Sequence, residues 1–221
     1  MLRSLGHPVT LLGLLVGFVL AVLAHGVAQA LAARLLGDRW ALRDARQPKK
    51  LIDVFGVVAA AIVGPGWGVS REPSYRSKGR RVAALLAGPV AAAAVGFVGV
   101  AAFLAAGGPS QVLPEIGPSQ IVRGLPGPPA EQVFSLALAL EALGVAMLSL
   151  IPLPPLTGWR ILSLLAPHTT GWQKARYYLE ERNFGIGILL ALLLLPIGVG
   201  ATPLLLELVD LLVAAVLAWG R

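Results

Sequence analysis

The polar residues of this chain that could do chemistry lie within apolar surroundings. His25 and Gln29 stand four residues apart, so on a helix they share one face. Glu141 interrupts a long apolar run, and a proline-rich stretch, SLIPLPPLTG, ends at Gly158. Ionisable groups at membrane depth are functional candidates, because burying them is costly. Such groups bind a metal ion, carry a proton or, as a plain alternative, form a satisfied pair in which Gln29 hydrogen-bonds His25.

The composition places these residues in a membrane protein. The 221 residues are 57% hydrophobic and 13% charged, with a mean hydropathy of +0.79, whereas soluble domains are about 25% charged. The sequence has no cysteine, which excludes disulfides, thiolate-bound zinc, iron–sulfur clusters and a cysteine nucleophile. The net charge of +7 does not indicate nucleic-acid binding, because the basic residues lie in loops between apolar runs, where they set membrane orientation.

We expect an all-α integral membrane protein that forms a single domain over residues 1–221, a polytopic helical bundle. A span needs about 20 mostly apolar residues. Five stretches are predicted to span, with an interfacial helix as the alternative for the last: residues 9–36, 82–106, 132–151, 184–200 and 204–219. The three prolines of IPLPP break the helix after the third span, and it is expected to resume from Gly158 to about Ala166.

Residues 51–68 are long enough to span, yet basic residues cluster on both sides of them. Lys and Arg collect in cytoplasmic loops, so both ends should lie on that side. This predicts a re-entrant loop, whose irregular backbone must be shielded by protein or water. The same rule places residues 107–131 outside, residues 158–183 inside with a short helix at 172–182, and the N terminus outside.

The proline-broken stretch is expected to place extended chain at membrane depth. Free backbone groups there need partners, such breaks mark binding sites in many membrane proteins, and a free strand edge can pair with an unfolded peptide. A kinked helix packed in protein is the alternative. For Glu141 we expect a neutral, hydrogen-bonded carboxyl, with a catalytic role as the alternative.

Four blocks of the chain, taken in order, resemble the site-2 proteases, a family of intramembrane zinc metalloproteases. The blocks are LAHGVAQALAARLLGD, PKKLIDVFG followed by VGPGWGVS, GRRVAALLAGPVAAA and LSLIPLPPLTGWRIL. The first resembles the helix that carries the HExxH motif, and the last resembles the block NLLPxPPLDGxRIL. The resemblance covers most of the chain and implies the helical membrane fold of that family.

The resemblance also implies a zinc site, and here the chain departs from the family pattern. In active members the two histidines of HExxH and the aspartate of LDG bind zinc, and the glutamate acts as general base on the metal-bound water. The corresponding residues of HExxH and LDG are, in order, His25, Gly26, Gln29 and Thr157, while Ser149 stands where members often carry Asn. One imidazole beside a neutral amide and a hydroxyl supplies neither the charge nor the base that zinc-dependent hydrolysis needs.

These departures predict a catalytically inactive relative, a pseudoprotease, for which no cofactor is expected. The composition, rich in Ala, Leu, Gly and Arg, is typical of a high-GC bacterium, so we expect the protein in a bacterial plasma membrane. Its expected partners are transmembrane or membrane-proximal segments of other proteins, which it would scaffold, chaperone or withhold from an active protease. The residues expected to bind them come from the proline stretch and the re-entrant loop: Ile151, Pro152, Leu153, Pro154, Pro155, Gly66 and Trp67.

Two other interpretations stay open on the sequence alone. One is an active intramembrane zinc metalloprotease with a rearranged metal site, in which His168 and Glu141 replace the missing ligands. The other is a transporter or channel that uses His25 and Glu141 as a proton or ion path, although the chain lacks the inverted repeat that many transporters show. Metal analysis of the purified protein, with a His25→Ala control, separates the first of these from the inactive relative.

Overall fold

The computed structural model of the chain is helical. The residues it describes are 1–38, 40–45, 47–71, 73, 77–124, 127–167, 169–196 and 202–219. Within these ranges the regular structure consists of helices and one isolated β-bridge, with no β-strand. The all-α class expected from the sequence is therefore confirmed.

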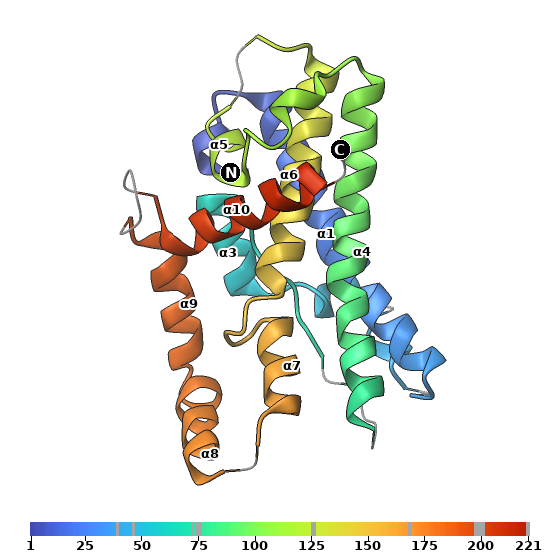
Figure 1. Cartoon of the computed structure of the whole chain (residues 1–221), viewed down its shortest axis with the longest axis vertical. Helices are drawn as coiled ribbons and strands as arrows, with labels where there is room; N and C mark the ends of the chain where they lie inside the picture. Colours follow the sequence, from blue (N-terminus) through green and yellow to red (C-terminus); the bar gives the residue numbers. More distant parts are fainter. Residues whose placement is uncertain are drawn as a thin grey trace.

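Three long apolar helices run along the long axis of the molecule (Figure 1): α1 (Pro8–Leu35), α4 (Lys78–Ala105) and α6 (Ala130–Ser149). Each is long and apolar enough to cross a membrane. They match the first three predicted spans within a few residues, because a mostly apolar run of this length leaves little choice of helix boundary. Their lengths and composition are those of a membrane protein.

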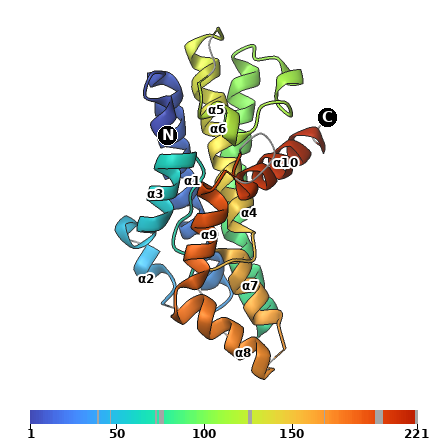
Figure 2. The same cartoon turned by 90° about the vertical axis from the view of Figure 1, so that its left-hand side faces the viewer.

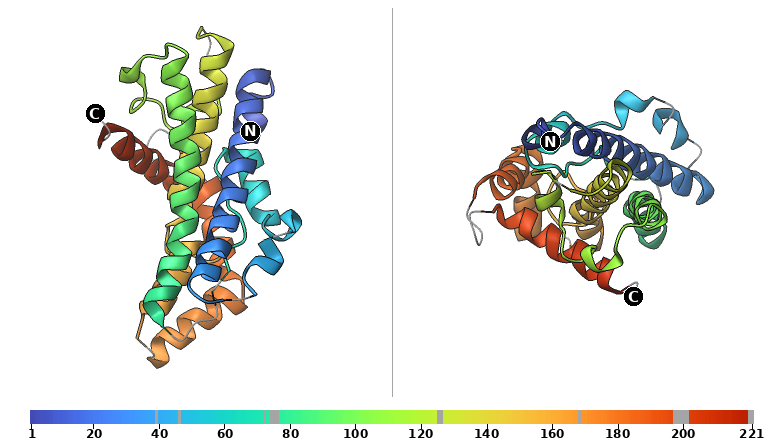
Figure 3. Two further views of the ribbon diagram at one scale, coloured as in Figure 1. Left: turned by 90° about the vertical axis from the view of Figure 1, so that its right-hand side faces the viewer. Right: turned by 90° about the horizontal axis from the view of Figure 1, so that it is seen from above.

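The third of these helices, α6, forms the centre of the bundle. Seen from above, it lies between α1, α4 and α10 (Leu204–Trp219) (Figure 3), and it packs against all three. Fourteen of its 20 residues are buried, against 11 of 28 in α1 and 8 of 28 in α4. The outer faces of α1 and α4 are accordingly the faces that meet lipid.

Glycines let the long helices approach one another closely. An added Cβ at Gly17 of α1 would lie 2.8 Å from the Leu138 carbonyl oxygen, and one at Gly99 of α4 would lie 2.9 Å from Ala139 Cα, both on α6. Helices in a bilayer associate through such close backbone packing, because lipid provides no hydrophobic force between them.

The two ends of the segment 51–68 lie side by side, joined by a β-bridge. Asp53 caps α3 (Val54–Val63) by accepting a hydrogen bond from the Gly56 N–H at 3.0 Å. The helix ends at Gly64, whose φ of 104° is one that only glycine adopts readily. The chain then returns, and an antiparallel bridge joins Ile52 to Gly68. With 10 residues, about 15 Å, α3 is too short to cross a bilayer.

The last two predicted spans are shorter than a membrane crossing in the described residues. α9 (Phe184–Leu194) has 11 residues, about 16 Å, and the predicted remainder of that span, residues 197–200, lies outside the described part of the chain. α10 has the predicted boundaries, but it runs across the bundle rather than along it (Figures 1 and 2). Asp210 of α10 accepts hydrogen bonds from the backbone N–H and the hydroxyl of Ser119 in α5 (Pro118–Ile121). In the described ranges the structure thus has three helices of spanning length, and the predicted count of five spans is not confirmed.

The proline stretch does not form the predicted extended strand. Between α6 and α7 (Thr157–Leu165) the chain folds into consecutive turns, in which the N–H of Leu153 bonds to the Ile151 carbonyl and that of Leu156 to the Leu153 carbonyl, each at 2.9 Å. Proline has no N–H to donate, and these two N–H groups are used locally. The prediction of a free strand edge for peptide pairing is therefore wrong. The prediction that the helix resumes at the LTG block is confirmed.

The predicted short helix at 172–182 is present as α8 (Thr170–Arg176) and the π-turn η4 (Tyr177–Glu181). Side chains of this segment hold it against α7. The indole N–H of Trp159 donates to Glu180 at 2.7 Å, and Glu180 also forms an ion pair with Arg176 at 3.0 Å. The rings of Trp159 and Trp172 lie 5.4 Å apart. These contacts fix the start of α7, where the LTG block lies.

Candidate functional site

The structure brings together three of the residues that align with the metal-centre motifs of the proteases the sequence resembles. His25 and Gln29 lie on α1, and Thr157, 128 residues beyond Gln29, is the first residue of α7. The Thr157 hydroxyl lies 3.1 Å from His25 Nε2 and accepts a hydrogen bond from Gln29 Nε2 at 3.3 Å. A fourth group, the Ser70 hydroxyl, lies 3.1 Å from that of Thr157. All four side chains are buried.

Two local features position Thr157 against α1. Leu156, the residue before it, is extended, so α7 begins at Thr157 itself. Gly158 follows, and a Cβ at that position would collide with the Leu150 carbonyl oxygen at the end of α6. The glycine of the LTG block therefore lets α7 start directly beside the end of α6, which places the Thr157 side chain at the imidazole.

The hydrogen bond between Gln29 and His25, one of the alternatives from the sequence, is not formed in the described residues. The Gln29 amide donates instead to the Leu85 carbonyl at 3.0 Å and to the hydroxyls of Thr157 and Ser70. The two side chains lie parallel on α1, and both point to partners on other segments. His25 uses one ring nitrogen for Thr157, while its Nδ1 has no hydrogen-bond partner in the described residues.

Two glycines shape the floor and the edge of this cluster. A Cβ at Gly88 of α4 would lie 2.8 Å from both His25 Nε2 and Gln29 Cγ, so α4 rests directly on the two side chains. At Gly26, the position of the general base in the related proteases, a Cβ would lie 2.8 Å from Leu51 Cδ2. An apolar leucine side chain therefore covers the place from which a glutamate would extend.

Sequence reasoning missed Ser70 and the role of Gly88. Both lie inside the blocks that resemble the family, VGPGWGVS and GRRVAALLAGPVAAA, but no chemistry was assigned to them. For Ser70 the signal was its position at the end of the Gly-rich block, whose irregular backbone was expected to need shielding by protein or water. For the glycine, only the helix packing seen in the structure identifies its neighbours.

The donor atoms present do not fit a catalytic zinc ion. Zinc in enzymes takes three good protein ligands, usually imidazole, thiolate or carboxylate, and keeps one position open for water. Here one imidazole meets an amide and two hydroxyls, with no anionic donor among them. In the residues that the structure describes, no group of three or more His, Cys, Asp or Glu side chains is placed to hold a metal ion.

The replacement ligands considered for a rearranged metal site are not brought to His25. The Cβ of Glu141 lies 3.1 Å from the position of a Cβ at Gly17. That is eight residues, or about 12 Å, along α1 from His25. His168 lies outside the described part of the chain.

The residues expected to bind a partner segment differ in exposure. Gly66, Trp67, Ile151 and Pro154 are buried, and the Gly66 Cα faces the Gly56 carbonyl and the Phe18 ring. The accessible residues lie in the turns before α7, where Pro152 is exposed and Leu153 and Pro155 are half-buried. A partner that docks here would meet side chains and proline rings rather than a strand edge.

Glu141 is fully buried at the centre of the bundle. Its Oε2 lies 3.5 Å from the position of a Cβ at Gly64, the glycine that ends α3. Neither carboxyl oxygen has a hydrogen-bond partner in the described residues. The hydrogen-bonded carboxyl expected from the sequence is thus not found there. The group is a buried carboxyl without a hydrogen bond, on which the buried N-terminal ammonium acts as an opposite charge.

Replacing Glu141 by leucine is expected to stabilise the protein. A buried polar group without a hydrogen bond costs about 1–3 kcal/mol, and leucine of similar size removes that cost. We expect Glu141→Leu to raise the midpoint of thermal unfolding in detergent, while Glu141→Gln, which keeps a polar group there, gives no gain. A drop in stability with leucine alone would mean that the carboxyl is compensated in the folded protein, by the N-terminal ammonium or by a partner on an ion or proton path.

Comparison with known proteins finds a similarity that covers most of the chain. Over 204 residues the chain is 28% identical to the "Putative zinc metalloprotease YwhC" of Bacillus subtilis (strain 168), and the alignment covers 89% of this chain and 87% of that protein. No family model and no solved structure matches. The chain is therefore a helical protein with three helices long and apolar enough to cross a membrane, and it is distantly similar to a protein that carries the name of a zinc metalloprotease.

Proposed function

We propose that this chain is a catalytically inactive member of the site-2 protease family that binds transmembrane or membrane-proximal segments of partner proteins. The observation that carries the proposal is the convergence of His25, Gln29 and Thr157. The fold assembles the metal-centre positions of such a protease, and the side chains found there hydrogen-bond with one another. A protease that has become a binding protein is expected to keep its scaffold and to lose its reaction centre.

The loss of the general base supports inactivity independently of the metal. General acid–base catalysis contributes about 10²–10⁴-fold to such reactions. At Gly26 there is no side chain, and Leu51 packs against this position. Zinc supplied to the chain would thus meet weak neutral donors and no adjacent carboxylate that could take a proton from water.

The arrangement in the membrane follows from charge. Basic residues gather where α1 ends and α4 begins and on α7 and α8, which marks that end of the bundle as cytoplasmic. The N terminus then faces outside. Residues 51–68 would enter and leave from the cytoplasmic side, in line with the Ile52–Gly68 bridge that holds their ends together. α10, which runs across the bundle, fits an interfacial helix, and a bacterial plasma membrane is the proposed location.

The proposed contact surface for a partner is the run of Pro152, Leu153 and Pro155. It is the exposed part of the turns that lead directly into Thr157, so a bound segment would lie next to the degenerate site. Its apolar side chains suit a segment that is itself apolar. The missing N–H groups of the prolines favour side-chain packing over strand pairing.

Site-specific photocrosslinking in native membranes tests the proposal. A photoreactive amino acid at Leu153 is expected to trap a membrane protein. The matched control is the same amino acid at Val90, which is 66% exposed on the lipid-facing side of α4. Failure to trap polypeptide at Leu153 above the level at Val90 contradicts the binding role. Peptidase activity that is lost on His25→Ala or on chelation contradicts the inactivity.

A further inference from the structure

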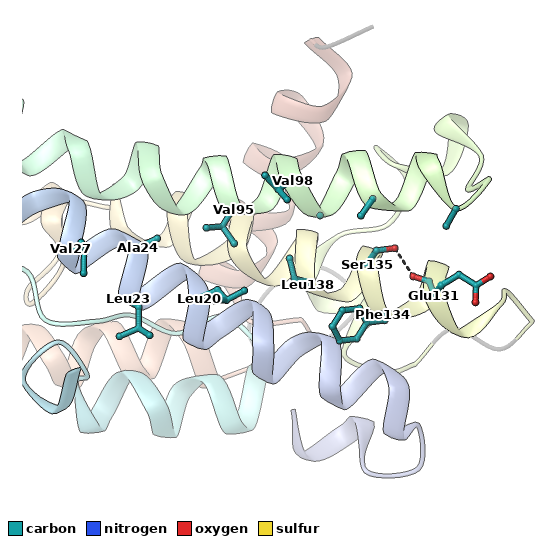
Figure 4. A pocket seen from close by; sticks show the side chains of 13 residues that line it. Leu20, Leu23, Ala24, Val27, Val95, Val98, Glu131, Phe134, Ser135 and Leu138 are labelled. Atoms are coloured by element: carbon teal, nitrogen blue, oxygen red, sulfur yellow. Dashed lines mark hydrogen bonds between the residues drawn. The ribbon is translucent and has the colours of Figure 1, made fainter. Parts of the chain in front are cut away.

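A deep apolar groove lies on the lipid-facing side of the bundle, at the end opposite the basic residues. α1 and α4 form its walls and α6 its floor (Figure 4). Its volume is about 680 Å³. Aliphatic and aromatic side chains line almost all of it, among them Leu20, Leu23, Val95, Val98, Phe134 and Leu138. The groove is separate from the cluster around His25, whose side chain is not part of the lining.

The groove arises from the way the two walls diverge. α1 and α4 are in contact where Gly88 packs on His25 and Gln29. Farther toward the end of α4, α6 lies between the walls, and Phe134 and Leu138 form the floor (Figure 4). At the outer end the Gln132 amide donates to the Ala106 carbonyl at 2.8 Å, which ties α4 to α6. The floor is thus fixed to one wall, and the groove opens sideways to lipid.

The length of the groove is that of one leaflet. Its lining on α4 extends from Val95 to Ala106, a rise of about 16 Å. The hydrocarbon core is about 30 Å thick, so one leaflet accounts for about half of it. A partner helix that crosses the membrane would use both leaflets, and the groove ends where α1 and α4 meet. The acyl part of a single lipid matches this length.

Among the described residues that line the groove, a single one is charged, and it stands at the outer mouth. Glu131, in the first turn of α6, is exposed and lies at the end of the groove (Figure 4). The nearby Ser135 hydroxyl donates to the Glu131 carbonyl at 2.7 Å and is used within its own helix. The mouth therefore presents a carboxylate at headgroup level above an apolar interior. The molecule that complements it has an acyl chain and a cationic head.

We propose that this groove is a binding site for one bilayer lipid whose headgroup carries an ammonium, such as phosphatidylethanolamine, with its acyl chain between α1 and α4 and its ammonium at Glu131. The inference does not depend on the proposed function. It concerns the lipid-facing side of α1, and the proposed partner surface lies in the turns before α7.

Native mass spectrometry of the full chain tests the acyl part of the proposal. The protein is reconstituted with equal amounts of phosphatidylethanolamine and phosphatidylglycerol and then extracted in mild detergent. We expect one retained phosphatidylethanolamine, and Ala102→Leu, which fills the groove, to reduce its occupancy at least tenfold. Ala101→Leu makes the same change at the neighbouring exposed residue outside the lining and should retain the lipid. Equal retention by the two variants overturns the proposal.

Two further measurements test the headgroup and the kind of occupant. Glu131→Gln should abolish the preference for phosphatidylethanolamine over phosphatidylglycerol, and an unchanged preference overturns the role of the carboxylate. A photoreactive amino acid at Val98, which is 70% exposed in the wall of the groove, should give adducts with the mass of one lipid in native membranes. Adducts with polypeptide instead would assign the groove to a partner helix or a second copy and overturn the proposal.

Discussion

A chain that carries Gln29→His and Thr157→Asp is expected to bind about one zinc ion, whereas the wild-type chain retains well under a tenth of an ion. The two changes return an imidazole and a carboxylate to positions that already meet at Thr157, whose hydroxyl lies 3.1 Å from His25 Nε2 and 3.3 Å from Gln29 Nε2. Two imidazoles and a carboxylate form one of the common ligand sets of catalytic zinc. Elemental analysis after extensive dialysis measures the metal content of both proteins.

The controls for this experiment use the same three positions. Each single replacement leaves only two good ligands and should bind zinc far more weakly, and His25→Ala on top of the double replacement should remove the ion. Stoichiometric, His25-dependent zinc in the wild-type chain would contradict both this prediction and the proposed function. Absence of zinc from the double variant would show that the fold no longer lets these three side chains bind a zinc ion together. It would still agree with a wild-type site that holds no metal.

The second large effect is expected at Gly88, where α4 rests on the cluster. A methyl group there would lie 2.8 Å from His25 Nε2 and from Gln29 Cγ, and such overpacking costs about 1–3 kcal/mol. Gly79→Ala is the matched control, since it makes the same change on the same helix with no atom within 4 Å. Removing a glycine from an exposed helix position should stabilise by up to about 1 kcal/mol. The midpoint of thermal unfolding in detergent should therefore fall for Gly88→Ala and rise for Gly79→Ala.

A double-mutant cycle identifies the cause of the Gly88 effect. In a His25→Ala background the imidazole is gone, so Gly88→Ala should lose at least half of its cost, with the remainder due to Gln29. An undiminished cost in that background would mean that the methyl group acts on the backbone of α4 or on α1 as a whole, and that Gly88 does not position the cluster.

The long helices and their order could be predicted from the sequence because each depends on a local signal. An apolar run of more than 20 residues fixes the helix and nearly its boundaries, as for α1 and α6. The convergence of His25 with Thr157 is different, since 132 residues separate them. No local pattern brings them together, and the expectation came from the resemblance of whole blocks to a family.

The features that could not be predicted depend on contacts that local composition does not specify. A hydrogen bond between Gln29 and His25 within one helix was one alternative, but Gln29 bonds to Leu85 and Thr157 on other segments. Hydrophobicity made residues 204–219 a candidate span, with an interfacial helix as the alternative, and in the structure this helix lies across the bundle, where Asp210 contacts Ser119. The turns at 151–156 form through short-range hydrogen bonds that the proline composition does not specify.

The position of Leu51 has an evolutionary consequence. Its side chain packs on Gly26, while its carbonyl accepts the Val69 N–H at 2.8 Å where the loop rejoins the bundle. A reversion of Gly26 to an acidic residue would meet the far end of this leucine side chain, which must turn away before a new carboxylate can reach the cluster. A lineage that regains the acid is therefore expected to adjust Leu51 as well. Ancestral states at these two positions should vary together rather than independently.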